Sequence, residues 1–355
     1  EKKIELSDKK TENREENEKT LYKDVEELNA LYDVLKKVMP SGFRQIYEEA
    51  RHRLEKNCAS SEKRNYLKQM AEILDFDWVS NAEYRPIDIE LVKKKIKRIH
   101  IGHNKQLDEI YTEFKASNIS RNAPRTLNFI GRPGTGINQL AEEIGEALGF
   151  GYAVINLAGV HMKETESLMG TSKIYENARS GMIYERIKEA GTRGVLIIED
   201  FDLYDSEIRN VLIPLIEKSS FIDKFVEVEI DLSDLFVIVT CSAIKDIPMS
   251  IRANMTPIYF QDLKEEEMVE TINKIIVPKY CKEYKLEFAK DIPRAACRKL
   301  IYKFSSMDMN KLDGVIRSIA VRTVTKGESV FPDYSIKDID EFNFSTEDYE
   351  KIHNE

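Results

Sequence analysis

The sequence has few cysteines and no long apolar run, and each absence excludes a class of protein. Its cysteines, Cys58, Cys241, Cys281 and Cys297, stand far apart and without Cys-x-x-Cys or Cys/His spacing, so neither a disulfide framework nor a zinc site is indicated. No apolar run approaches the ~18 residues that cross a bilayer, and residues 1–5 lack the apolar core of a signal peptide. We therefore expect a soluble protein without a metal site or membrane contact, in the cytosol or the nucleus.

A surplus of basic charge is also absent. The 355 residues include 63 acidic and 54 basic side chains, which gives a formal net charge of −9. This balance argues against a protein that coats a polyanion with its whole surface, although local basic faces are compatible with it. The length suits two domains, or one large domain with appendages.

Composition and apolar periodicity set the two ends of the chain apart from its middle. Residues 1–19 are nearly all polar and predict a disordered lead-in. Apolar residues recur at helical spacing through much of 21–74, with a break at 40–42, so residues 20–85 predict a helical N-terminal extension. Residues 331–355 are strongly acidic and predict a separate C-terminal segment.

The middle of the chain alternates between strand and helix patterns. Short apolar runs separated by helical stretches are typical of a parallel sheet covered by helices on both faces. The predicted strands are 126–130, 152–156, 194–198 and 235–240, and the predicted helices are one or two over 88–114, then 138–148, 170–190, 206–217, 264–278, 291–305 and 309–326. The last three helices follow one another without a strand. The expected fold is therefore an α/β base over 86–262 followed by an all-helical lid over 263–330.

A glycine-rich turn follows the first predicted strand. Gly131 and Gly136, with Gly134 between them, have the spacing of a phosphate-binding P-loop, G-x-x-x-x-G-K-[ST], between a strand and a helix. In such a loop backbone N–H groups wrap the phosphates, the lysine reaches the β- and γ-phosphates, and the Ser or Thr hydroxyl binds magnesium. Ile137 and Asn138 stand at these last two positions. We expect the shape of the turn to be retained, while a charge-assisted hydrogen bond of ~1.5–3 kcal/mol is lost.

Acidic residues follow the strand predicted over 194–198, as in the carboxylate motif of nucleotide hydrolases. The order here is Glu199 then Asp200, with Asp202 after them, whereas the usual order is Asp then Glu. The exchange moves both carboxylates by a methylene, and an error of ~1 Å in a positioned group can cost ~100-fold in rate. These carboxylates are as consistent with capping the strand end as with catalysis.

The order and spacing of these motifs resemble the AAA+ domains of the family that contains the largest subunit of the origin recognition complex. In that family a strand ending in Asn contacts the γ-phosphate, and Ser242 stands at the matching position here. Arg252, after Pro248, is the candidate for an arginine that acts on a neighbouring subunit. The lid motif normally carries an arginine, and residues 306–310 contain none. The resemblance implies an AAA+ fold in which most nucleotide-contacting residues are replaced.

An AAA+ domain with this many altered positions is similar to the fungal silencing proteins of the Sir complex, over about Lys93 to Lys326. The resemblance implies a catalytically inactive nuclear scaffold that binds nucleosomes, through their histones, and a partner silencing protein in transcriptional silencing and heterochromatin spreading. It implies no cofactor, no metal and no catalytic residue. The degenerate site would consist of Gly131, Gly134, Gly136, Ile137, Asn138, Glu199, Asp200 and Ser242.

Two alternatives belong to other functional classes. One is a divergent ATPase or ATP-dependent switch of the origin-recognition type, in which backbone amides of residues 132–137 still hold a nucleotide. The other is an inactive AAA+ subunit that completes a ring and donates Arg252 to a neighbouring site. Binding of ATP by the purified protein would distinguish the first alternative from the silencing scaffold.

Two basic stretches are candidate partner-binding surfaces. Lysine and arginine side chains can neutralise phosphates, with an affinity that falls as salt rises. The sequence is therefore compatible with DNA binding, without implying sequence specificity. The candidate residues are Lys93, Lys94, Lys95, Lys97 and Arg98 in the first stretch and Lys282, Lys285, Arg294 and Arg298 in the second.

Overall fold

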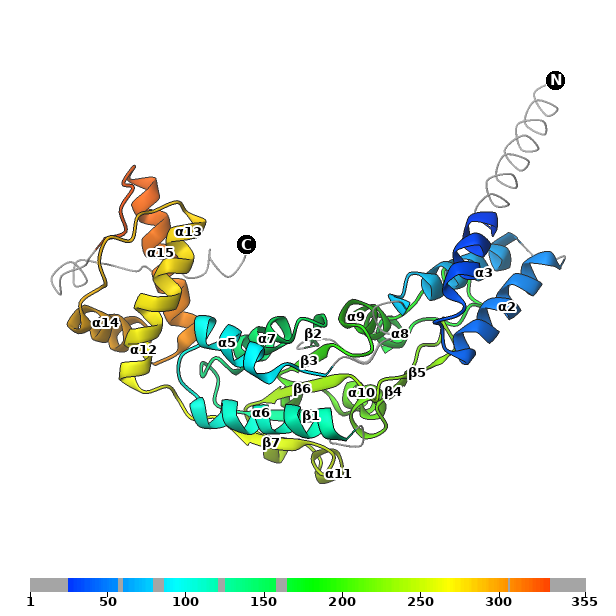
Figure 1. Cartoon of the computed structure of the whole chain (residues 1–355), viewed down its shortest axis with the longest axis horizontal. Coiled ribbons are helices and arrows are strands. Elements are labelled where there is room, and N and C mark those ends of the chain that lie inside the picture. The colour runs from blue at the N-terminus through cyan, green and yellow to red at the C-terminus, as the bar shows by residue number, and fades with distance from the viewer. Residues whose placement is uncertain are drawn as a thin grey trace, which may run out of the picture. The chain divides into compact units, whose positions relative to one another are not determined.

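A computed structural model describes residues 25–56, 60–78, 86–120, 125–157, 165–305 and 307–332 (Figure 1). They belong to two compact units, each assembled from separate stretches of the chain. The first unit takes Glu1–Pro86, Phe150–Leu196 and Tyr204–Phe236, and the second takes Ile87–Gly149, Ile197–Leu203 and Val237–Glu355. The lead-in predicted for 1–19, nearly all of the acidic segment predicted for 331–355, and Cys58 lie outside the described residues. The other three cysteines are buried and free.

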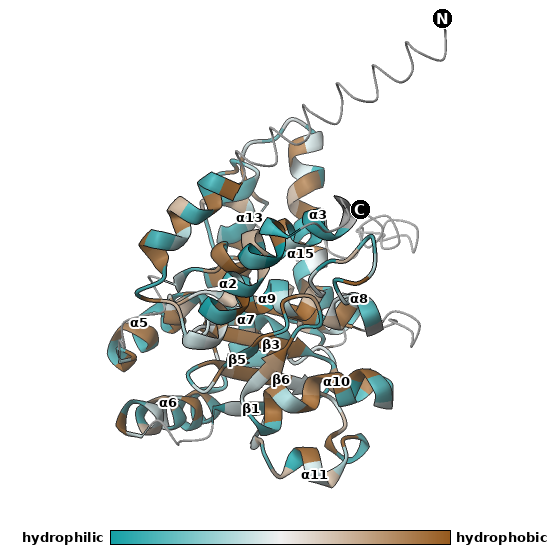
Figure 2. Ribbon diagram, turned by 90° about the vertical axis from the view of Figure 1, so that its right-hand side faces the viewer, coloured by the Kyte–Doolittle hydropathy of each residue, from teal (hydrophilic) through white to brown (hydrophobic). Residues whose placement is uncertain are grey.

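The fold is α/β with a parallel five-stranded sheet, as the alternation of apolar runs and helices predicts. The strand order is β2-β3-β6-β1-β7. The strands are β1 Thr126–Ile130, β2 Tyr152–Asn156, β3 Val195–Glu199, β6 Phe236–Cys241 and β7 Thr256–Tyr259. All residues of β1 and β6 are buried, and β3 and β6 are brown, hence apolar, in Figure 2, which is the pattern of strands covered on both faces. The four predicted strands match the observed ones to within one residue.

The edge strand β7 is one that the apolar pattern does not predict. It runs parallel to β1, with Leu127 opposite Thr256 and Ile130 opposite Tyr259. Its sequence contains Pro257, and because proline cannot donate to a ladder it is confined to edge positions in sheets. Only one residue of β7 is buried, so no apolar run marks the strand.

Helices of the second unit precede and follow β1. They are α5 Ile89–Ile99, α6 Asn104–Ile119 and α7 Ile137–Leu148. The stretch predicted as one helix or two over 88–114 is two helices, because His103 adopts the left-handed conformation (φ 51°) immediately before α6. Asp88 begins α5 by accepting a hydrogen bond from Leu91 N with its side chain, as expected of a helix N-cap.

The lid is all-helical and has an apolar core of its own. Its helices are α12 Glu265–Thr271, α13 Val277–Glu283, α14 Arg294–Leu300 and α15 Met309–Thr325, with π-helical turns at Ile272–Ile276 and Ile301–Ser305. Core residues include Met268, Ile272, Val277, Leu300, Leu312 and Ile316. The π turns join α12 to α13 and extend α14, so the three helices predicted at 264–278, 291–305 and 309–326 correspond to continuous helical stretches.

The first unit contains the N-terminal helices, three further helices and a small hairpin. A helix covers residues 25–35, followed by α2 Ser41–Glu55, α3 Ser60–Leu74, α8 Thr165–Met169, α9 Met182–Ala190, α10 Ser206–Glu217, and the antiparallel pair β4 Ser220–Ile222 and β5 Glu229–Asp231. Aromatic rings fill the N-terminal part: Tyr32 stacks on Tyr47 at 4.1 Å, and Phe43 meets Trp78 edge-on at 4.6 Å. None of the helices in the described stretches combines the length and apolar character needed to span a bilayer.

The helix predicted over 170–190 is wrong in its first half. Residues 170–181 form a loop, and only α9 is helical. Hydrogen bonds between Thr171 and Arg179 close this loop, from Thr171 N to Arg179 O and from Arg179 N to Thr171 Oγ1, each 3.0 Å. A Cβ on Gly181 would lie 2.3 Å from Leu168 O. This close backbone packing favours the loop over a longer helix. The spacing of apolar residues in the sequence carries no information about it.

Candidate nucleotide site

The turn between β1 and α7 has the backbone shape that the glycine spacing predicts. Gly134 and Gly136 lie in the left-handed region, at φ 87° and 81°, which residues with a Cβ rarely adopt. Thr135 stabilises the turn, because its N–H and its Oγ1 both donate to Arg132 O. The turn therefore has a P-loop backbone at the carboxyl end of β1.

The two replaced positions at the start of α7 supply no positive charge. Ile137 is 8% exposed and packs inward, since a Cβ on Gly131 would lie 3.2 Å from its Cγ2. Asn138 has a buried Oδ1 without a hydrogen-bond partner in the part of the chain that the structure describes. The arginine within the turn, Arg132, is ion-paired with Asp262. A phosphate in this turn would thus meet backbone N–H groups but no free cation from these residues.

The acidic residues after β3 are held by the end of β6. Asp202 Oδ2 accepts hydrogen bonds from Ser242 Oγ at 2.7 Å, Ser242 N at 3.1 Å and Ala243 N at 2.9 Å. Asp200 adopts φ 50° and its N–H donates to Thr240 Oγ1 at 3.0 Å. Glu199 is the last residue of β3. The hydroxyl of Ser242, at the position expected to contact a γ-phosphate, therefore donates to a carboxylate instead.

The lid brings a carboxylate onto the P-loop. Asp308 caps α15 by accepting hydrogen bonds from Asn310 N at 2.9 Å and Lys311 N at 3.1 Å. The next residue, Met309, donates its N–H to Gly134 O at 2.9 Å. A Cβ on Gly134 would lie only 2.6 Å from Asp308 Cγ, so the acidic side chain packs directly on the turn. A phosphate bound here would meet a like charge.

A small cavity lies between the P-loop, the connection from α5 to α6 and the lid. Its volume is about 40 Å³. That space holds roughly three waters and is far below the ~300–1,000 Å³ of typical ligand pockets. Its lysine, Lys279, is ion-paired with Asp313 at 3.2 Å. The polar side chains that line it belong to His100, Thr135, Gln139, Glu143, Thr271, Lys279 and Asp313.

A buried polar network fills one side of this cavity. His100 Nδ1 lies 2.9 Å from Glu143 Oε2, His100 Nε2 lies 3.2 Å from His103 Nδ1, and His103 Nε2 lies 3.0 Å from Gln261 O. The carbonyl of Gln261 can only accept, so His103 carries its proton on Nε2, and burial lowers the pKa of His103 and favours the neutral ring. His103 Nδ1 must then accept from His100 Nε2. Gln139 Nε2 donates to the second oxygen of Glu143 at 2.8 Å, which completes the network.

A magnesium–triphosphate complex, the usual ligand of an AAA+ site, does not fit the residues present. Arg132 and Lys279 are already paired with carboxylates, the Ser242 hydroxyl is used by Asp202, and Asp308 adds negative charge at the turn. Within the described ranges, no group of three or more His, Cys, Asp or Glu is placed to hold a metal ion. The geometry instead supports a P-loop that serves as a packing surface for the lid.

Alanine at Gly134 should weaken the contact between the lid and the P-loop. The new Cβ would meet the Asp308 carboxylate at 2.6 Å, so we expect loss of the Met309–Gly134 hydrogen bond in addition to the strain of a positive φ. Gly136→Ala is the matched control, because Gly136 has a similar φ of 81° and a Cβ there meets nothing within 4 Å. Gly134→Ala should cost ~1 kcal/mol more in urea unfolding than the control. It should also speed hydrogen exchange at the Met309 amide, whereas equal exchange in the two variants would contradict the contact.

Four of the nine basic candidates contact an acidic side chain or a backbone carbonyl. Lys93 pairs with Glu90 at 3.5 Å and Lys95 Nζ donates to Ala147 O at 2.9 Å. In the lid Arg294 pairs with Glu266 at 2.6 Å, and Arg298 pairs with Glu265. The candidates that have exposed side chains and take part in none of these four contacts are Lys94, Lys97, Arg98, Lys282 and Lys285.

Comparison with known proteins gives the chain a different affiliation from the one its motifs suggest. The chain is similar to Lon proteases. A Lon protease from Cytophaga hutchinsonii is 30% identical over 274 residues, which cover 72% of this chain and 33% of that protein. Lon protease 2 from Thermus thermophilus is 27% identical over 237 residues (59% and 29%), and Lon protease from Methanosarcina barkeri is 27% identical over 252 residues (68% and 31%). The chain thus spans about a third of the length of these curated relatives. No protein-family model matches it.

The similarity to Lon proteases overturns the resemblance to the Sir-complex and origin-recognition proteins. Replaced residues at the P-loop, the carboxylate motif and the lid show that an AAA+ site has changed. They do not show from which branch it changed, because the residues that would tell the branches apart are those that were lost. The predicted function as a catalytically inactive silencing scaffold is therefore wrong. The origin-recognition affiliation of the ATPase alternative is wrong as well, while the ring-completing role of Arg252 stays a prediction.

The partners and the location inferred from that resemblance are wrong as well. Nucleosomes, histones and a silencing protein were expected as partners, and the nucleus as the location, whereas the relatives come from bacteria and an archaeon, which have no nucleus. DNA binding through the two basic stretches stays a prediction. These relatives are named as proteases, so the prediction that the chain has no enzymatic role is also overturned.

Sequence reasoning missed the side chains that define the observed site. Asp308 lies inside the segment 306–310, where the prediction considered only the missing arginine. An Asp immediately before a helical pattern is an N-cap signal, and it could have placed this carboxylate at the start of α15. The pairing of His100 with Glu143 follows from tertiary packing between the α5–α6 connection and α7, and no local pattern reports it.

Proposed function

We propose that this chain is the AAA+ part of a Lon-type protease and that it engages protein substrates for degradation. The observation that carries the proposal is the similarity itself, which extends over 59–72% of the chain in the three relatives described above. The parallel sheet with a P-loop turn and a helical lid supports it, because this is an AAA+ arrangement. Since the chain spans about a third of those relatives, peptide-bond cleavage is not assigned to any residue of this chain.

A protein that engages polypeptides needs exposed apolar contacts, and the first unit has such a pair. Ile174 and Tyr175, adjacent in the loop between α8 and α9, are 86% and 65% exposed. Large apolar side chains at this exposure lose hydrophobic stabilisation in the free protein, and adjacent ones offer a contact for an apolar stretch of unfolded chain. We assign substrate contact to this pair.

The nucleotide site enters the proposal in a limited way. Because the residues around the P-loop do not fit a magnesium–triphosphate, the proposal assigns no nucleotide, metal or catalytic step to residues Gly131, Gly134, Gly136, Ile137, Asn138, Glu199, Asp200 or Ser242. Titration of the protein with a fluorescent ATP analogue and magnesium is the direct measurement. Micromolar binding would show that the lid leaves the P-loop and that this part of the proposal is wrong.

The proposed function is tested with an unstructured protein as substrate. We expect the native full-length protein to bind fluorescein-labelled casein and to release labelled peptides from it. Binding is measured by fluorescence anisotropy and cleavage by acid-soluble fluorescence. Absence of both binding and cleavage, with and without ATP, would overturn the proposal.

Removing the exposed pair should weaken substrate binding without unfolding the protein. The double change Ile174→Ser and Tyr175→Ser removes two apolar contacts from an exposed position, so we expect casein to bind about tenfold more weakly, equivalent to ~1.4 kcal/mol. The control is Ile222→Ser in β4, which removes an apolar side chain that is 52% exposed in the same unit. If the control weakens binding as much as the double variant, the loop has no special role.

A further inference from the structure

The loop that carries the exposed pair is closed on itself. Besides the two hydrogen bonds between Thr171 and Arg179, Tyr175 N donates to Ser172 O at 3.1 Å and Ala178 N donates to Tyr175 O at 3.2 Å. These turns fix the backbone on either side of Ile174 and Tyr175. The exposure of the pair is thus a property of an ordered loop, which we name the 171–179 loop.

One side chain of the N-terminal helices holds the tip of this loop. Asn65, on α3, is 2% exposed, and its Nδ2 donates to Lys173 O and to Tyr175 O, each at 2.8 Å. These two carbonyls flank Ile174 on both sides. A single buried amide group therefore sets the direction of the backbone from which Ile174 projects.

The residues next to Asn65 on α3 add to this support. Lys173 Nζ lies 5.5 Å from the centre of the Tyr66 ring and pairs with Glu227 at 2.7 Å. One helical turn after Asn65, Gln69 Nε2 donates to Phe225 O at 2.9 Å and to Val226 O at 3.1 Å. Positions four apart share a face of a helix, so one face of α3 contacts both the 171–179 loop and the segment at 223–228.

The segment at 223–228 in turn supports the C-terminal end of the loop. The carboxylate of Asp223 accepts a hydrogen bond from Gly181 N at 2.8 Å, and Lys224 N donates to Met169 O, before the loop, at 2.8 Å. The 171–179 loop is therefore held at its tip by Asn65 and near its two ends by the segment that Gln69 contacts. All three supports depend on α3 directly or through one intermediate segment.

The amide of Asn65 can face the loop in one orientation only. Its Oδ1 is buried and has no partner among the residues that the structure describes, and the same holds for Gln69 Oε1. A flipped amide would place Oδ1 against two carbonyl oxygens, so Nδ2 must point to the loop. The unpaired oxygen offsets what the two hydrogen bonds contribute to stability, while both bonds still fix the backbone of the loop.

We infer that α3 positions the 171–179 loop to bind an unfolded polypeptide, with Asn65 as the positioning residue and with Ile174 and Tyr175 as the contacts. The inference rests on the proposed function, since it takes the ligand to be a protein substrate. Its occupant is an extended chain segment with apolar side chains, which two adjacent, exposed and rigidly held apolar residues can contact. The N-terminal helices thereby become part of the substrate-binding apparatus.

The test replaces the donor of Asn65 and measures loop order and substrate binding separately. Asn65→Asp keeps the size of the side chain and turns a carboxylate toward two carbonyls, and Asn65→Ala is a second, uncharged variant in case the first fails to fold. Lys68→Ala, an exposed position on the same helix, is the control. Hydrogen exchange of residues 171–179 reports the loop, and casein binding and degradation by the full-length protein report function.

We expect faster exchange in the 171–179 loop, about tenfold weaker casein binding and a raised KM with an unchanged kcat. General destabilisation would instead lower the active fraction and thus kcat. Unchanged exchange would overturn Asn65 as the positioning residue, and faster exchange with unchanged casein binding would overturn the link between loop position and substrate. If the wild-type protein binds no casein, the proposed function fails, and with it the assigned ligand, while the exchange data still decide whether α3 holds the loop.

Discussion

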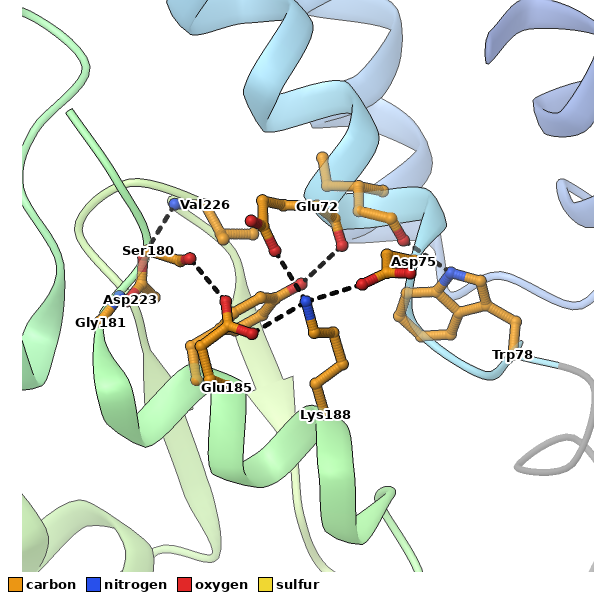
Figure 3. A network of polar contacts seen from close by, with 11 residues as sticks. Glu72, Asp75, Trp78, Ser180, Gly181, Glu185, Lys188, Asp223 and Val226 are labelled. Carbon is orange, nitrogen blue, oxygen red and sulfur yellow. Dashed lines mark hydrogen bonds and ion pairs between the residues drawn. The ribbon is translucent and has the colours of Figure 1, made fainter. Parts of the chain in front are cut away.

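Replacing Asp223 by alanine should lower the free energy of unfolding of the first unit by about 3 kcal/mol. The Asp223 side chain is fully buried, and it accepts hydrogen bonds from Gly181 N at 2.8 Å and Val226 N at 3.0 Å (Figure 3). It also accepts one from Phe225 N at 2.8 Å. Alanine leaves three buried N–H groups without an acceptor, and each such group costs roughly 1–3 kcal/mol. Urea denaturation, compared with the wild-type protein at the same pH, measures the loss.

Asp223→Asn is the matched variant, because it keeps one acceptor oxygen. That oxygen can still accept from Phe225 N and Val226 N, while the amide nitrogen faces Gly181 N and cannot accept from it. We therefore expect a loss between those of wild type and Asp223→Ala, with increased hydrogen exchange concentrated at Gly181. Equal stability of the alanine variant and wild type would show that the three bonds contribute nothing net.

The pKa of Asp223 gives this prediction a pH dependence. Burial raises the pKa of Asp223, and the three N–H donors oppose that shift only in part. A carboxyl group whose pKa is higher in the folded than in the unfolded state stabilises the fold at pH values below its unfolded-state pKa. This stabilisation is lost as pH rises through the folded-state pKa. The alanine variant has no carboxyl group at this position. Its free energy of unfolding should therefore fall less between acidic and neutral pH than that of the wild-type protein.

The fold could be predicted from the sequence where local pattern and tertiary structure agree. The apolar runs of β1, β3 and β6 are buried on both faces, and the spacing of Gly131, Gly134 and Gly136 matches a turn with two positive φ angles. The pattern fails where tertiary contacts decide. Pro257 hides β7, and the loop at 170–181 contains helix-compatible residues that close packing at Gly181 keeps out of a helix.

The site could be predicted only as an outline. Glycine spacing identifies the P-loop, and the residues at 137 and 138 show that its chemistry has changed. The contacts that replace that chemistry join distant positions, such as Asp308 with Gly134 and His100 with Glu143, and no local signal reports them. The motif losses also say nothing about affiliation, because similar losses can occur in any AAA+ branch, and this is why the inferred family and partners were wrong.

The support of the 171–179 loop was beyond prediction for a related reason. Asn65 reads in the sequence as one polar residue on a helical stretch, and Asp223 as one acid in an acidic stretch. Burial gives each its role, since only a buried amide or carboxylate must find partners for its hydrogen-bonding groups. Both roles follow from where α3 packs, which the sequence alone does not determine.

Replacing Lys188 by methionine should cost the first unit about 2–3 kcal/mol at neutral pH. Lys188 Nζ lies 2.9 Å from Glu72 Oε2, 2.8 Å from Asp75 Oδ2 and 2.9 Å from Glu185 Oε2, and its side chain is 16% exposed. Figure 3 shows the ammonium group between these carboxylates, which come from α3 with the residue that follows it and from α9. Methionine keeps an unbranched apolar side chain, one heavy atom shorter than that of lysine, but leaves three acids beside one another. Loss of one partner from a buried ion pair costs ~3–5 kcal/mol, and the exposure of Asp75 reduces that figure here.

The loss should depend on pH in a direction fixed by Glu72. Burial raises the pKa of Glu72, the charge of Glu185 adds to the shift, and Lys188 opposes it. Without Lys188 the folded-state pKa of Glu72 should rise further, so protonation at acidic pH relieves the repulsion and the deficit of the variant grows as pH increases. Urea denaturation of wild type and Lys188→Met at pH 4.5 and 7.5 measures this change. The control is Arg186→Met, which removes only the exposed pair with Glu189 on the same helix and should cost ~0.5 kcal/mol at either pH. An equal loss for Lys188→Met at both pH values would show that the three carboxylates do not repel one another.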